Sequence, residues 1–172
     1  EGMSRELGQS VVVENRPGAG TTIGTDFVVK SPADGYTLLL ATFAQAVNPS
    51  LIKNLPYNAS RDLIPVAMVG NSPNVLVVPS QSPFQSVADV ITYAQKFPGK
   101  LTYASQGNGT SAHLAGELFI SLTKVDMVHI PYKGASQAIT DVLGGQVQMT
   151  FATASAAANL VRGGKLKALA VT

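Results

Sequence analysis

The feature that most constrains this sequence is its alternation of short apolar stretches with amphipathic ones, separated by turns of a few residues. Continuous apolar runs are typical of strands that are buried on both faces, whereas apolar residues three and four positions apart are typical of helices. Strands that alternate with helices at this spacing predict an α/β fold with a mostly parallel sheet. The most regular part of the pattern begins at Leu101 and continues to Thr172.

This regular part predicts a series of four strands joined by three helices. The strands are expected at residues 101–105, 127–131, 147–152 and 166–172. The helices are expected at residues 136–143, at 154–162 and at 109–122, where Leu114, Leu118 and Leu122 recur at spacing four. Ligands of such sheets bind at the carboxyl ends of the strands, so the loops that follow the strands are the candidate sites.

The N-terminal half carries weaker signals. We expect strands at residues 11–13, 36–41, 65–69 and 74–78, and a helix at 21–30. A second helix follows a capping box at residues 86–89 and ends before Pro98-Gly99. Residues 48–62 are expected to form a loop, because Pro and Asn interrupt any periodicity there.

The chain is expected to form two lobes, residues 1–80 and 81–172. The boundary falls at residues 79–83, a segment of Pro, Gln and Ser. Residues 1–8 resemble the last turns of a helix that Gly8 ends, and residues 166–172 resemble a strand with nothing after it. We therefore expect each lobe to be incomplete and the chain to be a fragment.

Composition excludes several classes of protein. Only 13% of the residues are charged and 45% are hydrophobic, which excludes intrinsic disorder. The apolar runs are far shorter than the roughly 20 residues that cross a bilayer. A net charge of +2 is too small for a nucleic-acid surface. With no cysteine and two histidines, the chain is expected to hold no metal and no other cofactor.

The most informative loop runs from Ser105 to His113 and leads from a strand into a helix. Free N–H groups at a helix N-terminus bind anions, and Gly107 and Gly109 allow a ligand to approach the backbone. Thr110 and Ser111 add hydroxyl donors. Anion binding is the favoured interpretation; the alternative is that a hydroxyl merely caps the helix.

Nucleotide binding fits this loop less well. The loop matches G-x-G-x-x-A, but Asp126 lies at the start of the next strand, where it cannot hold a ribose. A second glycine-rich turn at residues 18–24 lacks the lysine of a Walker motif. His113 is as consistent with supporting the loop as with touching a ligand, and His129 is expected to be structural. No set of residues here is typical of catalysis.

Five blocks of sequence resemble the Bug (Bordetella uptake gene) solute-binding proteins, the extracytoplasmic receptors of tripartite tricarboxylate transporters. The blocks are VVVENRPGAG at residues 11–20, DGYTLL at 34–39, NPSL at 48–51, YASQGNGTS at 103–111 and HIPYKG at 129–134. They follow one another in the family's order across essentially the whole chain.

The resemblance implies a type II periplasmic-binding fold, in which two α/β lobes close on a small carboxylate in the periplasm. It implies a binding protein, not an enzyme, whose partners are that ligand and the membrane permease subunits of the transporter. Carried over by position, the ligand residues are Thr42, Phe43 and Gln45 in the first lobe and Gln106, Gly107, Asn108, Gly109, Thr110, Ser111, His113 and Thr153 in the second.

Two departures from the family pattern matter. The family's chains extend further at both ends, which again indicates truncation. The family often has Phe-Asp where this chain has Phe151-Ala152. Relatives that bind amino acids can use that Asp to hold the ammonium group, so Ala152 indicates a mono- or dicarboxylate without an α-amine.

Two other functions remain open from the residues alone. The first is an α/β enzyme that binds a phosphorylated or nucleotide substrate through residues 107–111. The second is a structural or regulatory domain, which would melt at the same temperature with or without small ligands.

Overall fold

A mixed sheet of five strands forms the centre of the computed structural model, which describes residues 2–172. The strand order is β3-β2-β4-β1-β5. Strand β2 pairs in parallel with β3 and β4, whereas β1 pairs antiparallel with β4 and β5. Four of the five strands therefore run in one direction, which confirms the predicted α/β fold with a mostly parallel sheet. The strands are β1 (Asn74–Pro79), β2 (Leu101–Ser105), β3 (Met127–Pro131), β4 (Met149–Thr153) and β5 (Leu166–Val171).

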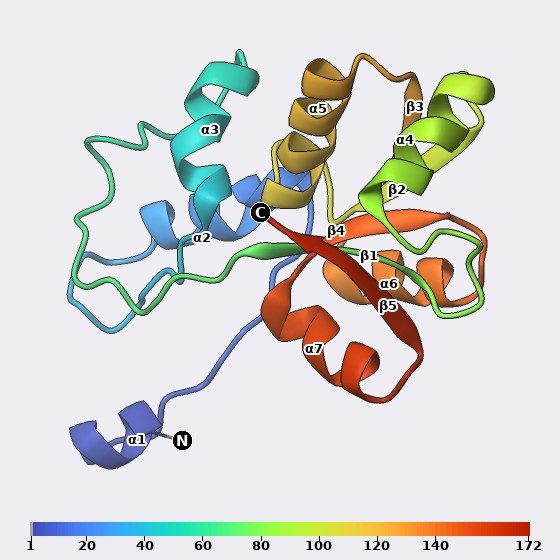
Figure 1. Cartoon of the computed structure of the whole chain (residues 1–172). Coiled ribbons are helices and arrows are strands. Elements are labelled where there is room, and N and C mark those ends of the chain that lie inside the picture. The colour runs from blue at the N-terminus through green and yellow to red at the C-terminus, as the bar shows by residue number, and fades with distance from the viewer. Residues whose placement is uncertain (1) are drawn as a thin grey trace.

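Two pairs of helices cover the two faces of the sheet (Figure 1). On one face lie α4 (Val87–Lys96) and α5 (Ser111–Thr123), and on the other lie α6 (Ala135–Leu143) and α7 (Ala154–Arg162). The predicted strands and helices from residue 74 onward are thus confirmed to within two residues at each end.

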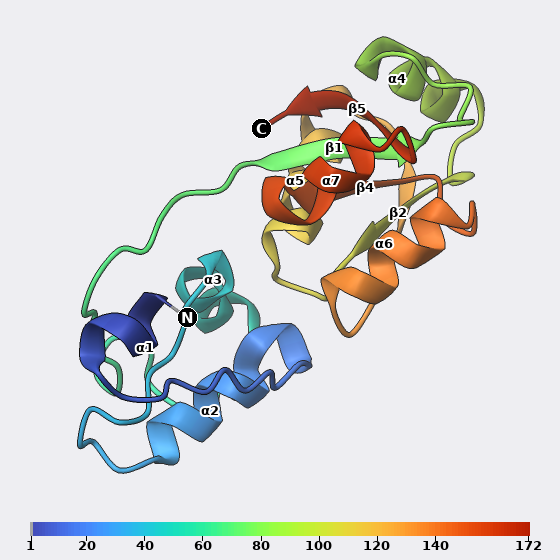
Figure 2. The same ribbon diagram turned by 90° about the horizontal axis from the view of Figure 1, so that it is seen from below.

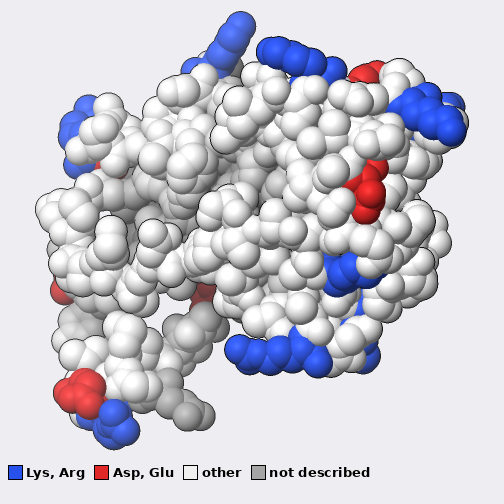
Figure 3. Space-filling model, viewed as in Figure 1, with Lys and Arg blue, Asp and Glu red and all other residues white. Residues whose placement is uncertain are grey.

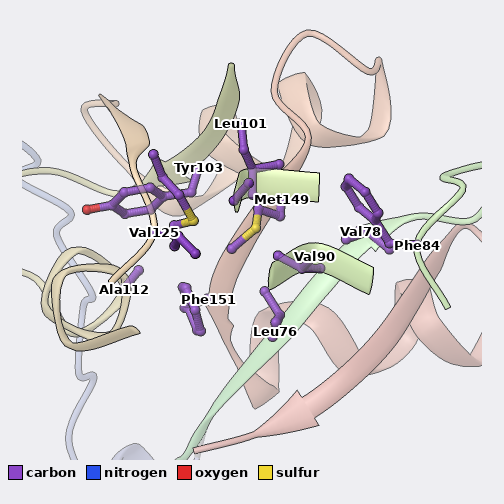
Figure 4. Packing of buried hydrophobic residues seen from close by; sticks show 12 residues of the cluster. Leu76, Val78, Phe84, Val90, Leu101, Tyr103, Ala112, Val125, Met149 and Phe151 are labelled. Carbon is purple, nitrogen blue, oxygen red and sulfur yellow. The ribbon is translucent and has the colours of Figure 1, made fainter. Parts of the chain in front are cut away.

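The core consists of two clusters, one on each face, because successive side chains of a strand point to opposite faces. Leu76, Tyr103 and Phe151 point toward α4 and α5, and Figure 4 shows this cluster. Val77 and Ala104, which alternate with them, pack toward α6 and α7. Burial on both faces explains why these strands appear in the sequence as continuous apolar runs.

The N-terminal part contains helices and loops that lie to one side of the sheet (Figure 2). Its elements are α1 (Gly2–Leu7), the 3-10 helix η1 (Ala19–Thr21), α2 (Thr22–Lys30) and α3 (Phe43–Leu51). The helix end at Gly8 and the helix at 21–30 are confirmed, while Glu1 lies outside the described residues. The division into lobes near residue 80 stays a prediction; β1, which precedes that position, belongs to the sheet.

Three predicted strands in this part are wrong. Residues 11–13, 36–41 and 65–69 have irregular backbone, and Val12, Tyr36 and Val66 are 84%, 92% and 84% exposed. A strand is stabilised by the strands that pair with it, and none lies beside these segments in the described chain. The predicted loop at 48–62 is also partly wrong, because α3 extends to Leu51. Pro49 lies in the last turn of α3, where its missing N–H removes one helical hydrogen bond and the helix ends two residues later.

Helix α5 turns a different face to the sheet from the one its leucines suggest. Leu118 and Leu122 are 58% and 73% exposed, whereas Ala112 and Gly116 are buried against the sheet. A Cβ atom on Gly116 would overlap the ring of Tyr103. The small residues therefore let α5 approach β2 closely.

Candidate functional site

Three helices begin at the same edge of the sheet. Helices α5, α6 and α7 directly follow β2, β3 and β4, whose carboxyl ends meet at one edge because these strands are parallel. Their N-cap residues are Thr110, Gly134 and Thr153, and among residues 2–172 none of these three caps is completed by a side-chain hydrogen bond. In α7 the first of these N–H groups, that of Ala154, donates to the carbonyl of Pro73 (3.0 Å). The other N–H groups of the three first turns are left for another acceptor.

Helix α4 provides the contrast. It follows β1, which runs against the other strands, so it begins at the opposite edge. Its N-terminus carries the complete capping box that the sequence predicted. Asp89 donates its backbone N–H to Ser86 Oγ (3.2 Å), and Asp89 Oδ2 accepts from the N–H of Ser86 (2.9 Å). Hydrogen bonds from Gln85 and Ser86 hold the pKa of the Asp89 carboxyl below its usual value.

The glycine loop, residues 106–110, connects β2 to α5 and is held by its own side chains. Gly107 N–H donates to Ser105 Oγ (3.1 Å), and Thr110 Oγ1 donates to the Gly107 carbonyl (2.6 Å). Ser111 Oγ donates to Asn74 Oδ1 (3.2 Å). Neither hydroxyl caps α5, so the structure does not support the alternative in which Thr110 or Ser111 serves as the helix cap.

Both histidines lie directly behind this loop. His113 Nδ1 accepts the N–H of Gly109 (3.1 Å), and His129 Nε2 lies 2.6 Å from Ser105 Oγ. The two rings stack with centroids 4.2 Å apart, and the ring of Tyr103 stacks on His129 at 4.9 Å. Burial and the neighbouring His113 lower the pKa of His129 to about 4, so this ring is neutral at pH 7.

The second glycine-rich turn packs against the glycine loop. Gly18, Ala19, Gly20 and Thr21 all have positive φ, with values of 46° at Ala19 and 77° at Thr21. Such backbone is strained in residues other than glycine and is found mainly where the surrounding structure requires it. A Cβ atom on Gly20 would lie 2.5 Å from the carbonyl oxygen of Asn108, so the two backbones touch.

Asn48 of α3 joins the turn and the loop. Its side chain is fully buried, and Nδ2 donates to the carbonyl of Gly20 (2.9 Å). Its Oδ1 lies 3.2 Å from the position of a Cβ on Gly109 and has no hydrogen-bond partner in the part of the chain that the structure describes. Leu51 Cδ1 lies 3.1 Å from the same Cβ position. The contact between α3 and the loop is thus made by the second half of the helix.

The structure brings most of the predicted ligand residues to one place. Those of the second lobe lie at the edge where α5 and α7 begin, and Gln106 and Thr153 line one small pocket together with Ile139 and Ala152. This set comprises Gln106, Gly107, Asn108, Gly109, Thr110, Ser111, His113 and Thr153. The predicted residues of the first lobe, Thr42, Phe43 and Gln45, lie instead at the first turn of α3.

No hydrogen bond joins that first turn to the glycine loop within residues 2–172. Gln45 Oε1 lies 3.5 Å from both the hydroxyl of Thr25 and that of Tyr57, within the N-terminal part. Ligand contact by either group of residues stays a prediction.

Sequence reasoning missed three residues of the site. The sequence places Ser105 at the start of the informative loop without a role of its own, and it predicts a structural role for His129. Asn48 fell in the predicted loop. No sequence signal indicates the role of His129, which occupies on β3 the register position beside Tyr103 of β2. That pairing is visible only once the strand order is known.

The other surfaces are less informative. The larger hollow, lined by Pro79, Phe84, Tyr93 and Gln148, lies at the opposite edge and has no charged side chain in its wall. Lys and Arg side chains are scattered around the molecule in Figure 3 and form no continuous patch on this face. In residues 2–172 no helix is both long and apolar enough to cross a membrane. No group of three metal-ligating side chains occurs in this range either.

Comparisons with known proteins show which family and which fold this chain matches. Residues 1–172 match the tripartite tricarboxylate transporter family receptor, TctC. The chain is 44% identical over 167 residues to Protein BugT of Bordetella pertussis, covering 96% of this chain and 51% of that protein.

Two solved structures show the same fold. The periplasmic binding protein BugD is 35% identical, with a TM-score of 0.94 over 99% of this chain and 57% of its own. R. palustris Rpa4515 with adipate is 36% identical, with a TM-score of 0.95 and the same coverage. The chain thus spans about half the length of the curated relatives that it matches.

Proposed function

The chain belongs to the tripartite tricarboxylate transporter receptor family, to which the Bug proteins also belong, and we propose that it captures a small organic carboxylate for such a transporter. The family and the structural neighbours are solute-binding receptors and not enzymes. The proposal therefore concerns which ligand is bound and where.

The observation that carries the proposal is the difference between the two edges of the sheet. At the edge with α5, α6 and α7 no side chain of residues 2–172 caps the three helix N-termini, whereas α4 at the other edge has a complete capping box. Each free helix N-terminus carries a partial positive charge and several N–H donors. A carboxylate satisfies both, because it is an anion with two acceptor oxygens.

The ligand is proposed to lack an α-amine. Burying an ammonium group without an acidic partner costs roughly several kcal/mol of binding free energy. Ala152 and Thr153 occupy the place where such a partner is expected, and the glycine loop contains no acidic residue. Adipate, which the neighbouring structure contains, is an amine-free dicarboxylate. This supports a mono- or dicarboxylate over an amino acid.

The proposed partners and location follow from the family. A receptor of this kind passes its ligand to the membrane permease subunits of the tripartite transporter, and it works outside the cytoplasm. For this chain we propose the periplasm, in line with the periplasmic binding protein that it resembles in structure.

The test is binding by the complete gene product that carries this chain. Calorimetry with adipate, succinate, aspartate and ATP separates the candidates. We expect adipate or succinate to bind and to raise the melting temperature, since a ligand of the native state stabilises it. Binding of ATP alone would favour the enzyme alternative, and binding of aspartate alone would contradict the amine-free class.

Proline at the first residue of a helix gives a matched set of variants. Proline fits that position and removes one N–H without breaking the helix. We expect Ser111→Pro in α5 to weaken carboxylate binding about tenfold, which corresponds to roughly one hydrogen bond to a charged group. Val87→Pro in the capped α4 should leave the affinity unchanged. Equal affinity in both variants would remove the N-terminus of α5 from the site.

A further inference from the structure

The two glycine amides of the glycine loop are each held from behind by a histidine. Gly109 N–H donates directly to His113 Nδ1 (3.1 Å). Gly107 N–H donates to Ser105 Oγ (3.1 Å), and that hydroxyl lies 2.6 Å from His129 Nε2. Every link in this set is a hydrogen bond between buried or half-buried groups. The chain has only these two histidines, and both are used here.

The histidines come from different elements and are held against each other. His113 lies on α5 and His129 on β3, with their rings stacked at 4.2 Å. On the far side of His129 the ring of Tyr103 from β2 stacks at 4.9 Å. The titratable groups that contact this stack are Glu117, 3.8 Å from His113 Nε2, and Tyr103, whose hydroxyl donates to Glu117 (2.6 Å).

This arrangement determines which amides remain for a ligand. The N–H groups of Gly107 and Gly109 are directed inward to Ser105 and His113. The N–H groups of the first turn of α5 are left facing the edge of the sheet, since Thr110 Oγ1 bonds the Gly107 carbonyl instead of capping the helix. A loop fixed in this way needs little reordering when an anion binds, and pre-organisation of this kind raises affinity.

Resting on the proposed function, we propose that Ser105, His113 and His129 are positioning residues that hold the glycine loop in its carboxylate-binding geometry. They act through the loop and do not touch the ligand. Apolar side chains in place of the two histidines would leave the Gly109 N–H without its acceptor, and they would leave the Ser105 hydroxyl, which accepts from Gly107, without its partner. Each buried polar group left unpaired in this way carries a cost.

Variants of His113 and His129 separate positioning from packing. His113→Leu keeps bulk but loses the acceptor, whereas His113→Asn places an amide oxygen near the position of Nδ1. In the same way His129→Leu loses the contact with Ser105, and His129→Gln can restore it. Thr102→Val at the other end of β2 is the control, because it breaks the side-chain bond to Gln148 without touching the loop.

Two measurements on the complete gene product decide the question: adipate affinity by calorimetry and amide hydrogen exchange by NMR. We expect His113→Leu to bind adipate at least tenfold more weakly and to lose protection at Gly109. We expect His113→Asn to stay within about threefold of the wild type. Likewise, we expect His129→Leu to bind adipate more weakly and to lose protection at Gly107, whereas His129→Gln should stay close to the wild type in both measurements. Thr102→Val should lower the melting temperature and leave the affinity unchanged.

The outcomes distinguish this inference from the function on which it rests. If the wild type binds adipate and the leucine variants bind it equally well, the positioning role is wrong while the receptor function stands. If leucine and asparagine at position 113 weaken binding equally, packing explains the effect and the positioning role is again wrong. If the wild type binds neither adipate nor succinate, the proposed function itself is contradicted.

Discussion

His129 shows how one half-buried ring can make the stability of this fold depend on pH. It has a pKa of about 4 in the folded chain, because burial and the adjacent His113 disfavour its charged form. In an unfolded chain the pKa of a histidine is about 6.5. Between these two values the unfolded state binds more protons than the folded state. The free energy of unfolding therefore falls as the pH falls through this range.

We expect the wild type to lose more stability between about pH 7 and pH 5 than the variant His129→Gln, which has no titrating ring. Urea unfolding at the two pH values measures the difference. A matched variant at an exposed residue, Lys124→Gln, should follow the wild type. The same loss of stability in His129→Gln and in the wild type would show that His129 is not the group responsible.

At the scale of elements, α5 illustrates a helix whose position is set by its smallest residue. Gly116 faces Tyr103, which is fully buried, and its missing side chain brings the helix backbone against the ring. The Tyr103 hydroxyl then reaches Glu117 one residue further along α5. Burial and this carboxylate raise the pKa of Tyr103. Because His113 lies on the same helix, the packing at Gly116 also places the residue that holds Gly109.

A methyl group at position 116 should therefore be costly. We expect Gly116→Ala to destabilise the fold by about 1–3 kcal/mol, the usual cost of overpacking a core. Gly24→Ala is the control within a helix, since its Cβ would meet only ordinary contacts 3.4 Å away and alanine favours helix by about 0.5–1 kcal/mol. Chemical denaturation measures both. A neutral Gly116→Ala would mean that α5 does not lie this close to Tyr103.

At the scale of the whole molecule, the sequence predicts those strands that are buried by helices close to them in the chain. Each strand from β1 to β5 is packed by helices near it in sequence, so runs such as Val75–Val78 and the turns between elements were enough to predict it. Residues 11–13, 36–41 and 65–69 have equally strong strand patterns, but strand pairing depends on what lies alongside in space. Pattern alone contains no information about that.

The candidate site also has one part that the sequence predicts and one part that it does not. The glycine loop could be predicted because a strand, two glycines and a helix are adjacent in the sequence. The stacking of His113 on His129 and the contact of Asn48 with Gly20 join residues that are 16 and 28 positions apart. These contacts depend on the order of the strands in the sheet and on how α3 packs against the loop. No sequence motif indicates them.

The central claim is that a carboxylate binds at the edge of the sheet where α5, α6 and α7 begin. The most direct measurement is an NMR titration of the complete gene product with adipate, followed at the backbone amides. We expect the amides of Ser111, Ala135 and Ser155 to shift with a common affinity while that of Val87, at the capped start of α4, stays in place. Shifts confined to Val87 and its neighbours, or none at Ser111 when adipate binds, would contradict the account.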